Sequence, residues 1–512
     1  MNETAHALGA SGTFWELIER RAALTPDRAF LIQDDRTLTF GDLRTRAERV
    51  AAGLYAEGVR PGTVVAWQLP TRLETVLLSF ALTRLGAVQT PVIPFYRDRE
   101  VGFALREAGA EHFAVPGTWR GFDHTAMAAR LSADLPHPPR VFEAYGTLPD
   151  GDPAALPPPP PDGTTVRWIY WTSGTTSDPK GVLHTDRSLI AGGSCLAHAL
   201  RLSADDVGSV AFPFAHVGGP DYAVMLLLYG FPAVLFEHFA MPDALADYRR
   251  HRVTVAGGST AFYSMFLTEQ RKTPATPLIP TLRLLAGGGA PKPPEIYHAV
   301  VREMGVQLTH GYGMTEVPMI TMGSPDDTVE QLAETEGRPP EGMEIRITDE
   351  DGAPLPHGTD GEVRLRGEAV CRGYLGAAPP FDEDGFLITG DLGHVRPSGH
   401  LVLTGRLKDV IIRKGENISA KEIEDLLARH PRVGDAAVIG LPDESRGERV
   451  CAVVEQPPGA AALTLPELTA YLRDEGLSVH KLPEQLELVD AMPRNEALRK
   501  VLKYELRARF SV

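Results

Sequence analysis

A run of hydroxyl-bearing residues and glycine that ends in a single lysine is the stretch of this chain best suited to bind phosphate. It has the sequence Trp-Thr-Ser-Gly-Thr-Thr-Ser-Asp-Pro-Lys-Gly, residues 171 to 181, and follows an apolar strand candidate, Val166 to Tyr170. Backbone amides and Ser/Thr hydroxyls donate hydrogen bonds to phosphate oxygens, and Lys180 would add a positive charge. A Walker A loop is excluded, because no glycine directly precedes the lysine and no serine or threonine follows it. Ser/Thr/Gly clusters are more often plain surface turns, but the length of this string and its Pro-Lys-Gly ending favour a phosphate site.

Four further motifs follow along the chain, and each has an ordinary structural interpretation when taken alone. They are Gly287-Gly288-Gly289-Ala290-Pro291 after the strand candidate Leu282 to Leu285, Gly311-Tyr312-Gly313-Met314-Thr315-Glu316, Thr389-Gly390-Asp391, and Gly405-Arg406-Leu407-Lys408-Asp409 continuing through Lys414-Gly415-Glu416-Asn417-Ile418. A glycine triplet after a strand is typical of a tight turn, and a Gly-Asp pair of a turn. In this order, however, the five motifs resemble the adenylate-forming enzymes, the superfamily of acyl-CoA synthetases, luciferases and peptide-synthetase adenylation domains. The resemblance extends over nearly the whole chain.

This resemblance implies an ATP site built from the motifs. The residues that it assigns to nucleotide or cofactor binding are Thr172, Ser173, Gly174, Thr175, Thr176, Lys180, Gly288, Gly289, Ala290, Pro291, His310, Gly311, Tyr312, Gly313, Met314, Asp391, Arg406, Lys414, Gly415 and Glu416. The glycines allow close backbone approach, so that adenine would lie against them with Tyr312 on its other face. Asp391 would accept hydrogen bonds from both ribose hydroxyls, a task that suits an ionised carboxylate, with Arg406 supporting it.

Catalytic and metal-binding roles are implied for a second set of residues. Thr315 would touch the α-phosphate, and Glu316 would hold Mg²⁺, a hard cation that prefers carboxylate and phosphate oxygens. His216 lies in Pro-Phe-Ala-His-Val-Gly-Gly, residues 213 to 219. That string resembles the acyl-pocket entrance of CoA-ligating members, where the histidine closes over the carboxylate. A lone histidine is usually packed or at the surface, so this role depends on the resemblance.

The adenylating lysine departs from the family pattern. The family signature is Pro, Arg or Lys, Thr or Asn, two variable residues, Gly and the catalytic Lys, whereas this chain has Pro493-Arg494-Asn495-Glu496-Ala497-Leu498-Arg499-Lys500. One residue is inserted and the glycine is absent, so that counting from Pro493 places Arg499 at the catalytic position. Arginine does not reproduce lysine geometry, and the downstream match from Lys500 to Lys503 leads us to favour Lys500. A second departure is Ser177, where glycine is usual in the phosphate loop.

Alternating strand and helix patterns must position these motifs. The expected elements begin with a helix at Phe40 to Gly58, a strand at Val64 to Leu69, a helix at Val76 to Leu85 and a strand at Ala87 to Val92. Repeated strand–helix–strand units predict a mostly parallel sheet with helices on both faces, continuing to about residue 330. Short strands between residues 344 and 404 indicate a small β unit. A compact α/β piece follows, in which Ser419 and Glu422 have capping-box spacing before the helix Ala420 to His430.

The expected fold class is therefore α/β. A large N-terminal domain, residues 1–407, would combine parallel-sheet α/β subdomains with the small β unit, and a small C-terminal α/β lid, residues 408–512, would be mobile. By the resemblance, Lys408 lies at the hinge. The lid would close for acyl-adenylate formation and then rotate, so that the loop from Lys414 to Asn417 faces the site for thiol attack.

The implied activity is that of an ATP-dependent acid–CoA ligase. Such an acyl-CoA synthetase activates a carboxylic acid as acyl-AMP, releases pyrophosphate and transfers the acyl group to the thiol of CoA, with Mg²⁺ as cofactor. Two alternatives stay open: a free-standing enzyme that loads a carrier protein, and a relative that performs only one half-reaction. Amino-acid selection is disfavoured, because no aspartate occurs between Phe212 and Gly219. The identity of the acid is not legible from the sequence.

Composition and charge exclude several other classes. Of the 512 residues, 43% are hydrophobic and 23% charged, which is typical of a globular protein rather than a disordered or fibrous one. Lys and Arg number 51 against 67 Asp and Glu, and the net charge of −16 argues against nucleic acid or an anionic membrane as a partner. Three separated cysteines and an N-terminus without a leader pattern indicate a reduced, cytoplasmic enzyme. The oligomeric state stays open; a homodimer is compatible, since many relatives of this size are dimers.

Overall fold

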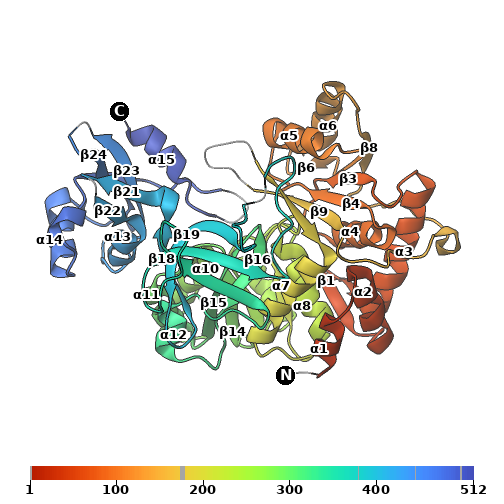
Figure 1. Ribbon diagram of the computed structural model, residues 1–512. Helices are drawn as coiled ribbons and strands as arrows, with labels where there is room; N and C mark the ends of the chain where they lie inside the picture. Colours follow the sequence, from red (N-terminus) through yellow and green to blue (C-terminus); the bar gives the residue numbers. More distant parts are fainter. Residues whose placement is uncertain are drawn as a thin grey trace.

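The computed structural model describes residues 3–172, 179–378, 380–414, 416–443, 445–495 and 499–511, and its architecture is α/β, as the alternation of elements predicts. A large N-terminal part carries parallel and mixed sheets with a small antiparallel β unit. A smaller C-terminal part lies against one side of it (Figure 1). The expected division into a large N-terminal and a small C-terminal unit is thereby confirmed.

The largest sheet has the strand order β10-β9-β4-β3-β5-β8. Its strands are β3 (Val64–Trp67), β4 (Val88–Pro91), β5 (His112–Val115), β8 (Arg140–Glu143), β9 (Val166–Trp171) and β10 (Gly181–Thr185). Neighbours pair in parallel except β9 and β10, which form an antiparallel pair on either side of the phosphate-loop segment. The sheet therefore places both ends of that segment at one edge.

Two further sheets complete the α/β portion. The first, in the order β11-β12-β1-β2, contains β1 (Ala29–Gln33), β2 (Arg36–Thr39), β11 (Gly208–Val210) and β12 (Ala233–Leu235). The second, in the order β13-β14-β15-β16, contains β13 (Val255–Gly258), β14 (Leu284–Gly288), β15 (Gln307–Met314) and β16 (Val317–Met322). Strands β13, β14 and β15 are parallel, so their carboxyl ends meet at one edge, where two of the glycine-rich motifs lie. A two-stranded hairpin joins β6 (Thr118–Trp119) and β7 (Phe122–Asp123).

The antiparallel β unit and the C-terminal sheet follow in the chain. The β unit contains β17 (Met343–Thr348), β18 (Gly361–Gly367), β19 (Leu387–Val395) and β20 (Leu401–Arg406) in sequential order. The C-terminal sheet has the order β22-β21-β24-β23, with β25 beside β24, and contains β21 (Val410–Arg413), β22 (Glu416–Ser419), β23 (Asp435–Asp443), β24 (Gly447–Glu455) and β25 (Gln485–Val489). Lys408 lies between β20 and β21, in the short 3₁₀ helix Leu407–Asp409.

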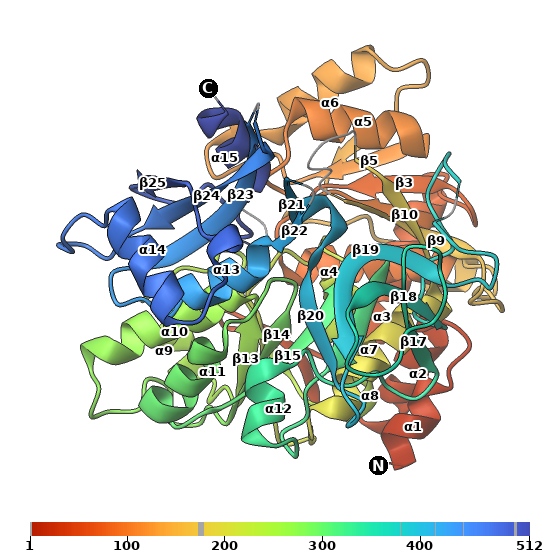
Figure 2. The same cartoon turned by 60° about the vertical axis from the view of Figure 1, so that its left-hand side comes forward.

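Helices cover the sheets (Figure 2). They are α1 (Glu3–Gly9), α2 (Phe14–Leu24), α3 (Phe40–Ala56), α4 (Leu73–Leu85), α5 (Asp98–Ala108), α6 (His124–Ala133), α7 (Asp186–Ala199), α8 (Gly218–Tyr229), α9 (Ala244–Arg250), α10 (Thr260–Lys272), α11 (Pro294–Ala299), α12 (Val329–Glu334), α13 (Ala420–Leu427), α14 (Leu465–Asp474) and α15 (Lys503–Phe510). Helix α4 is buried along its whole length, which explains why its apolar residues occupy every face. Among the described residues, every helix is too short or too polar to cross a lipid bilayer.

The predicted start of the first C-terminal helix is correct, but its cap is only half formed. Ser419 Oγ accepts a hydrogen bond from the backbone N–H of Glu422 at 3.3 Å. The Glu422 carboxylate turns instead to Lys481, 2.7 Å away, rather than back to the N-cap amide. Helix α13 also ends at Leu427, earlier than the apolar pattern to His430 predicts.

Candidate active site

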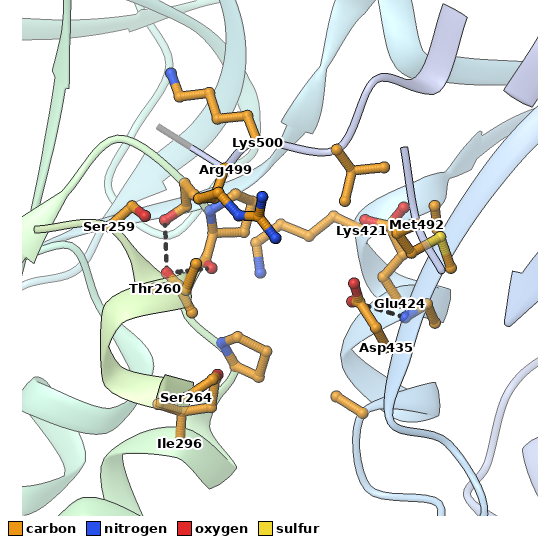
Figure 3. Close-up of a pocket in the computed structure, with 18 of the residues that line it drawn as sticks. Ser259, Thr260, Ser264, Ile296, Lys421, Glu424, Asp435, Met492, Arg499 and Lys500 are labelled. Atoms are coloured by element: carbon orange, nitrogen blue, oxygen red, sulfur yellow. Dashed lines mark hydrogen bonds between the residues drawn. The ribbon is translucent and has the colours of Figure 1, made fainter. Parts of the chain in front are cut away.

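Several of the predicted motifs line one cavity between the N-terminal and C-terminal parts, about 1420 Å³ in volume; Lys180, His216, Thr315 and Glu316 are not among its lining residues. The described residues that line it include the predicted site residues Gly289, Ala290, Pro291, Gly311, Tyr312, Gly313, Asp391, Arg406, Lys408 and Lys500. Figure 3 shows the two sides approaching each other, with Thr260 and Ser264 on the N-terminal side and Lys421 and Arg499 on the C-terminal side. Motifs that are up to two hundred residues apart in the sequence thus form one site.

The glycine triplet ends β14 where the backbones of neighbouring strands come closest. A Cβ on Gly287 would lie 1.7 Å from the carbonyl oxygen of Gly258, and one on Gly288 would lie 2.4 Å from that of Gly311. Gly289 then leaves the strand with φ +81°, in the left-handed region that favours glycine. Strand packing and a tight turn therefore require these glycines whether or not a ligand lies against them.

His310 holds this turn from behind. Its Nε2 donates a hydrogen bond to the Ala290 carbonyl at 2.9 Å, since a carbonyl only accepts, and its Nδ1 lies 3.3 Å from the hydroxyl of Tyr263. Burial, followed by the charge of Lys292, lowers the pKa of His310 to about 3, so the ring is neutral. Direct contact between His310 and a nucleotide stays a prediction, and the structure places the ring beneath the loop that would carry one.

Asp391 is a buried carboxylate with both oxygens engaged. The Tyr312 hydroxyl donates to Oδ2, and Arg406 Nε lies 2.8 Å from Oδ1. The pairing of β19 with β20 places Asp391 directly opposite Arg406. Burial, and then the nearby carboxylate, raises the pKa of the Tyr312 hydroxyl well above its usual value, so Tyr312 stays a donor. The sulfur of Met314 lies 4.0 Å from the Tyr312 hydroxyl.

Glu316 is the second buried carboxylate, and its surroundings differ. Its Oε1 accepts a hydrogen bond from the hydroxyl of Tyr374 at 2.7 Å. Within the described part of the chain Glu316 forms no ion pair, although it lies close enough to Lys500 for its charge to attract that ammonium. The preceding residue is held separately, because His184 Nε2 donates to the carbonyl of Thr315 at 2.7 Å.

The described ends of the phosphate loop pair with each other. The backbone N–H of Thr172 donates to the carbonyl of Lys180 at 3.0 Å, and the N–H of Lys180 donates to Thr172 Oγ1 at 3.2 Å. The Lys180 ammonium lies 4.7 Å from the centre of the Tyr374 ring. The predicted binding residues Ser173, Gly174, Thr175 and Thr176 lie outside the described residues, as does Ser177. The predicted position of Gly415 likewise lies outside them.

Lys500 lines the cavity, and its backbone is held by Asn495. The N–H of Asn495 donates to the Lys500 carbonyl at 2.9 Å, the N–H of Lys500 donates to Asn495 Oδ1 at 3.0 Å, and Arg499 adopts φ +58°. The Lys500 Cε lies 3.9 Å from the position of a Cβ on Gly289. Burial, and then the Arg406 guanidinium, lowers the pKa of Lys500 to about 8, against the opposing attraction of nearby carboxylates.

Arg499 and Lys500 diverge. Figure 3 shows the two side chains leaving the backbone in different directions, with the Arg499 guanidinium on the side of Lys421. Lys500, hydrogen-bonded to Asn495, lies near Arg406 and the carboxylates of Asp391 and Glu316. The choice of Lys500 over Arg499 as the adenylating residue stays a prediction.

His216 lies just before α8, and one hydrogen bond defines which ring nitrogen carries the proton. The backbone N–H of Gly218 donates to Nδ1 at 3.1 Å, so the proton of the neutral ring is on Nε2. Burial, and then the charge of Lys500, lowers the pKa of His216 to about 3. His216 is therefore neutral near pH 7 and offers an N–H donor close to the Lys500 ammonium.

The lid-loop residues are not brought to this cavity. Lys414 is exposed, and its N–H donates to the Arg446 carbonyl at 2.7 Å. Glu416 is exposed in the β21–β22 hairpin, opposite Arg413. Lys408, in contrast, lines the cavity, and burial and then Arg406 lower its pKa. The cavity thus contains the hinge lysine and Lys500 but not the described lid-loop residues.

Tyr374 touches two predicted site residues, although sequence analysis does not single it out. Its hydroxyl binds Glu316 and its ring faces Lys180. It lies between β18 and β19, nearly two hundred residues after the phosphate loop, so spacing gives no sign of the contact. The Gly373-Tyr374 pair between two predicted strands is the only feature of the sequence that marks the position.

The chain is similar to known proteins along most of its length. Residues 18–375 match the family described as AMP-binding enzyme, and residues 422–497 match the AMP-binding enzyme C-terminal domain. Salicyl-AMP ligase / salicyl-S-ArCP synthetase of Mycobacterium tuberculosis is 34% identical over 477 residues, which cover 89% of this chain and 82% of that protein. Medium-chain fatty-acid–CoA ligase of Escherichia coli is 29% identical over 511 residues, covering 96% and 89%.

The fold of this chain is also similar to that of a solved structure. O-succinylbenzoate coenzyme A synthetase (MenE) from Bacillus subtilis, in complex with ATP and magnesium ion, superposes with a TM-score of 0.83 at 28% identity. The match covers 96% of this chain and 98% of that one. The agreement therefore includes both the N-terminal and the C-terminal parts.

Proposed function

The chain belongs to the AMP-binding enzyme family of adenylate-forming ligases, and on that premise we propose that it is an ATP-dependent acid–CoA ligase. In the first half-reaction a carboxylate oxygen of the acid bonds to the α-phosphorus of ATP, the bond from that phosphorus to the bridging oxygen breaks, and pyrophosphate leaves. In the second, the CoA sulfur bonds to the acyl carbon, AMP leaves, and the thiol proton passes to solvent.

The observation that carries the proposal is the position of Lys500. Its side chain reaches across from the C-terminal part to Gly289, near Arg406 and the two buried carboxylates. An ammonium in that place would neutralise charge on the attacking carboxylate and the α-phosphate. His216, with its proton on Nε2, would donate to the same carboxylate. Thr315, whose carbonyl is held by His184, would turn its side chain to the α-phosphate.

We assign nucleotide binding to the carboxylate of Asp391 and to the phosphate loop. Asp391, already oriented by Tyr312 and Arg406, would accept hydrogen bonds from the ribose hydroxyls. Lys180 would contact the phosphates of ATP. The residues also fit Mg²⁺: Glu316 has a carboxylate that is oriented by one hydrogen bond and forms no ion pair among the described residues, beside the expected phosphates. When bound, Mg²⁺ would neutralise charge on those phosphates.

The second half-reaction would need a different arrangement of the C-terminal part. We place the boundary between residues 407 and 408, with Lys408 at the hinge and residues 408–512 as a mobile lid. The exposed Lys414 and Glu416 lie outside the cavity when Lys500 is inside it. Rotation about the hinge would exchange these two elements, so that one pocket serves both half-reactions.

A second candidate function is loading of a carrier protein instead of CoA. It is favoured by the 34% identity to a relative whose name includes a carrier-protein synthetase activity. Both candidates share the first half-reaction and differ only in the thiol. A relative limited to one half-reaction is the third alternative, and the inward position of Lys500 counts against loss of the first.

A panel of aliphatic, alicyclic and aryl acids tests the proposal. The enzyme is incubated with ATP, Mg²⁺ and each acid, and pyrophosphate release and CoA-thioester formation are measured with and without CoA. We expect one class of acid to give pyrophosphate and a CoA thioester. Acyl-AMP without any thioester, followed by transfer to a phosphopantetheine-bearing carrier protein, would assign the second function. No pyrophosphate with any acid would count against both.

A further inference from the structure

Tyr374 is fixed beside the strand that leaves the phosphate loop. The chain around it pairs with β10: the N–H of Leu183 donates to the Gly373 carbonyl at 3.0 Å, and the N–H of Leu375 donates to the Gly181 carbonyl at 2.8 Å. These bonds extend the sheet by one short segment at the edge where the phosphate loop ends. The position of the Tyr374 side chain is therefore set by backbone pairing and not by its own contacts alone.

The same segment also holds Glu316. The N–H of Cys371 donates to the Glu316 carbonyl at 2.8 Å, and the Tyr374 hydroxyl donates to its Oε1 at 2.7 Å. One short stretch of chain thus anchors both the backbone and the side chain of the proposed metal ligand.

The ring of Tyr374 has a separate contact with the proposed phosphate ligand. Lys180 Nζ lies 4.7 Å from the ring centre, within the range of a cation–π interaction. Lys180 and Glu316 form no ion pair in the described structure, although the same aromatic side chain contacts both. A cation and an anion that meet directly neutralise each other, and neither would then be available to a ligand.

We propose that Tyr374 is a positioning residue that keeps Lys180 and Glu316 apart, the lysine on its ring and the glutamate on its hydroxyl. Separated in this way, the lysine is available to the phosphates of ATP and the glutamate to Mg²⁺. The inference rests on the proposed function of those two residues. It adds that loss of the ring lets them form an ion pair, which costs affinity for both ligands.

Two substitutions separate the hydroxyl from the ring. Tyr374→Phe keeps the aromatic ring between Lys180 and Glu316 and removes the hydrogen-bond donor to Glu316. The gain in ATP affinity on adding Mg²⁺ should then be about tenfold smaller, as for other residues that orient a metal ligand. Binding of ATP in EDTA, which depends on Lys180, should stay within about twofold of wild type. Tyr374→Leu removes both contacts and should weaken ATP binding in EDTA as well, by about tenfold.

A double variant distinguishes positioning from a general structural role. If Lys180 is captured by Glu316 in Tyr374→Leu, then adding Glu316→Gln should release it and restore ATP binding in EDTA to near the wild-type value. A merely structural defect would not be repaired by a second substitution. Tyr471→Phe is the matched control, because that hydroxyl donates to the Leu426 carbonyl in the C-terminal part, away from the cavity; it should change none of these values.

Calorimetric titration of the full chain with ATP, in EDTA and in Mg²⁺, is the measurement, with thermal unfolding as the check on folding. Phe and Leu variants that bind ATP like the wild type in both conditions would overturn the role of Tyr374 while leaving the proposed function intact. So would a Leu variant that the added Glu316→Gln does not restore. A wild-type chain that binds no ATP would instead overturn the proposed function and, with it, this inference.

Discussion

Two buried carboxylates, Asp391 and Glu316, each accept a hydrogen bond from a tyrosine hydroxyl. Among the described residues, only Asp391 also forms an ion pair. Asp391 receives Tyr312 on one oxygen and the Arg406 guanidinium on the other. Glu316 receives Tyr374 and forms no ion pair among the described residues, with the Lys500 ammonium farther off but still attracted by it. Both are less than one-tenth exposed, so solvent does little to screen either charge.

The difference indicates what each carboxylate is built to bind. A carboxylate whose charge is already offset by an arginine keeps its lone pairs for neutral hydroxyl donors, such as those of a ribose. A buried carboxylate without a cation is costly to maintain, and that cost is relieved when a cation arrives. The same pair of residue types, tyrosine and acid, can therefore serve a sugar at one place and a metal at another.

The largest expected effect comes from Lys500, whose pKa burial and then Arg406 lower to about 8 against the attraction of both carboxylates. Lys500→Ala should reduce acyl-adenylate formation by about 10²- to 10³-fold, as removal of a preorganised charge does. Thioester formation from chemically made acyl-adenylate should be largely kept. Arg499→Ala is the control, because its side chain points elsewhere, and it should change both rates little. The reverse pattern would assign the role to Arg499.

The difference between the two carboxylates can be tested by removing the ion-pair partner of Asp391, which then resembles Glu316. Arg406→Gln leaves Asp391 with Tyr312 and no cation, so AMP affinity should fall about tenfold, or about 1.4 kcal/mol. The loss should be partly offset by added divalent cation, because the uncompensated carboxylate then attracts one. Equilibrium AMP titration with and without Mg²⁺ measures both effects. Unchanged AMP affinity would mean that the arginine does not prepare Asp391 for its ligand.

The pH dependence of adenylation should show whether the reaction requires the Lys500 ammonium, which lies near both carboxylates. With the pKa of Lys500 at about 8, its ammonium is present below that pH and is lost as pH rises above it. The kcat/KM for adenylation should then fall with pH above about 8, approaching tenfold per unit. His216, with a pKa of about 3, should contribute no limb near neutrality. A flat profile to pH 10 would show that the protonated amine is not required.

The smallest expected effect concerns an ion pair at the far side of the cavity. Arg429 on the C-terminal part lies 2.8 Å from Glu295 on the N-terminal part, and both side chains are more than one-third exposed. Exposed pairs contribute about 1 kcal/mol or less, so Glu295→Gln should slow adenylation relative to thioester formation by no more than about fivefold. Rates of the two separated half-reactions measure this. An increase in the adenylation rate would exclude the pair as a brace for this lid orientation.

Much of the architecture follows from local pattern, because strand–helix alternation and the order of glycine-rich motifs are short-range features. The adjacency of Asp391 and Arg406 follows from two strands that pair directly across a tight connection. The contact of Tyr374 with Glu316 does not, since it depends on a segment that joins the edge of a distant sheet. The direction of the Lys500 side chain could not be derived from the sequence either, because it depends on the hydrogen bond that the Lys500 N–H donates to Asn495 Oδ1 and on the left-handed backbone of Arg499.

The most direct test of the proposed division between the carboxylates crosses two variants with two ligands. Asp391→Asn and Glu316→Gln keep shape and remove charge, and each is titrated calorimetrically with AMP in EDTA and with ATP in Mg²⁺, after thermal unfolding confirms that both are folded. The account predicts that Asp391→Asn loses affinity for both ligands by tenfold or more. Glu316→Gln should bind AMP within about twofold of wild type and lose only the Mg²⁺-dependent part of ATP binding. If Glu316→Gln weakens AMP binding as much as Asp391→Asn does, the two carboxylates share one function and the division is contradicted.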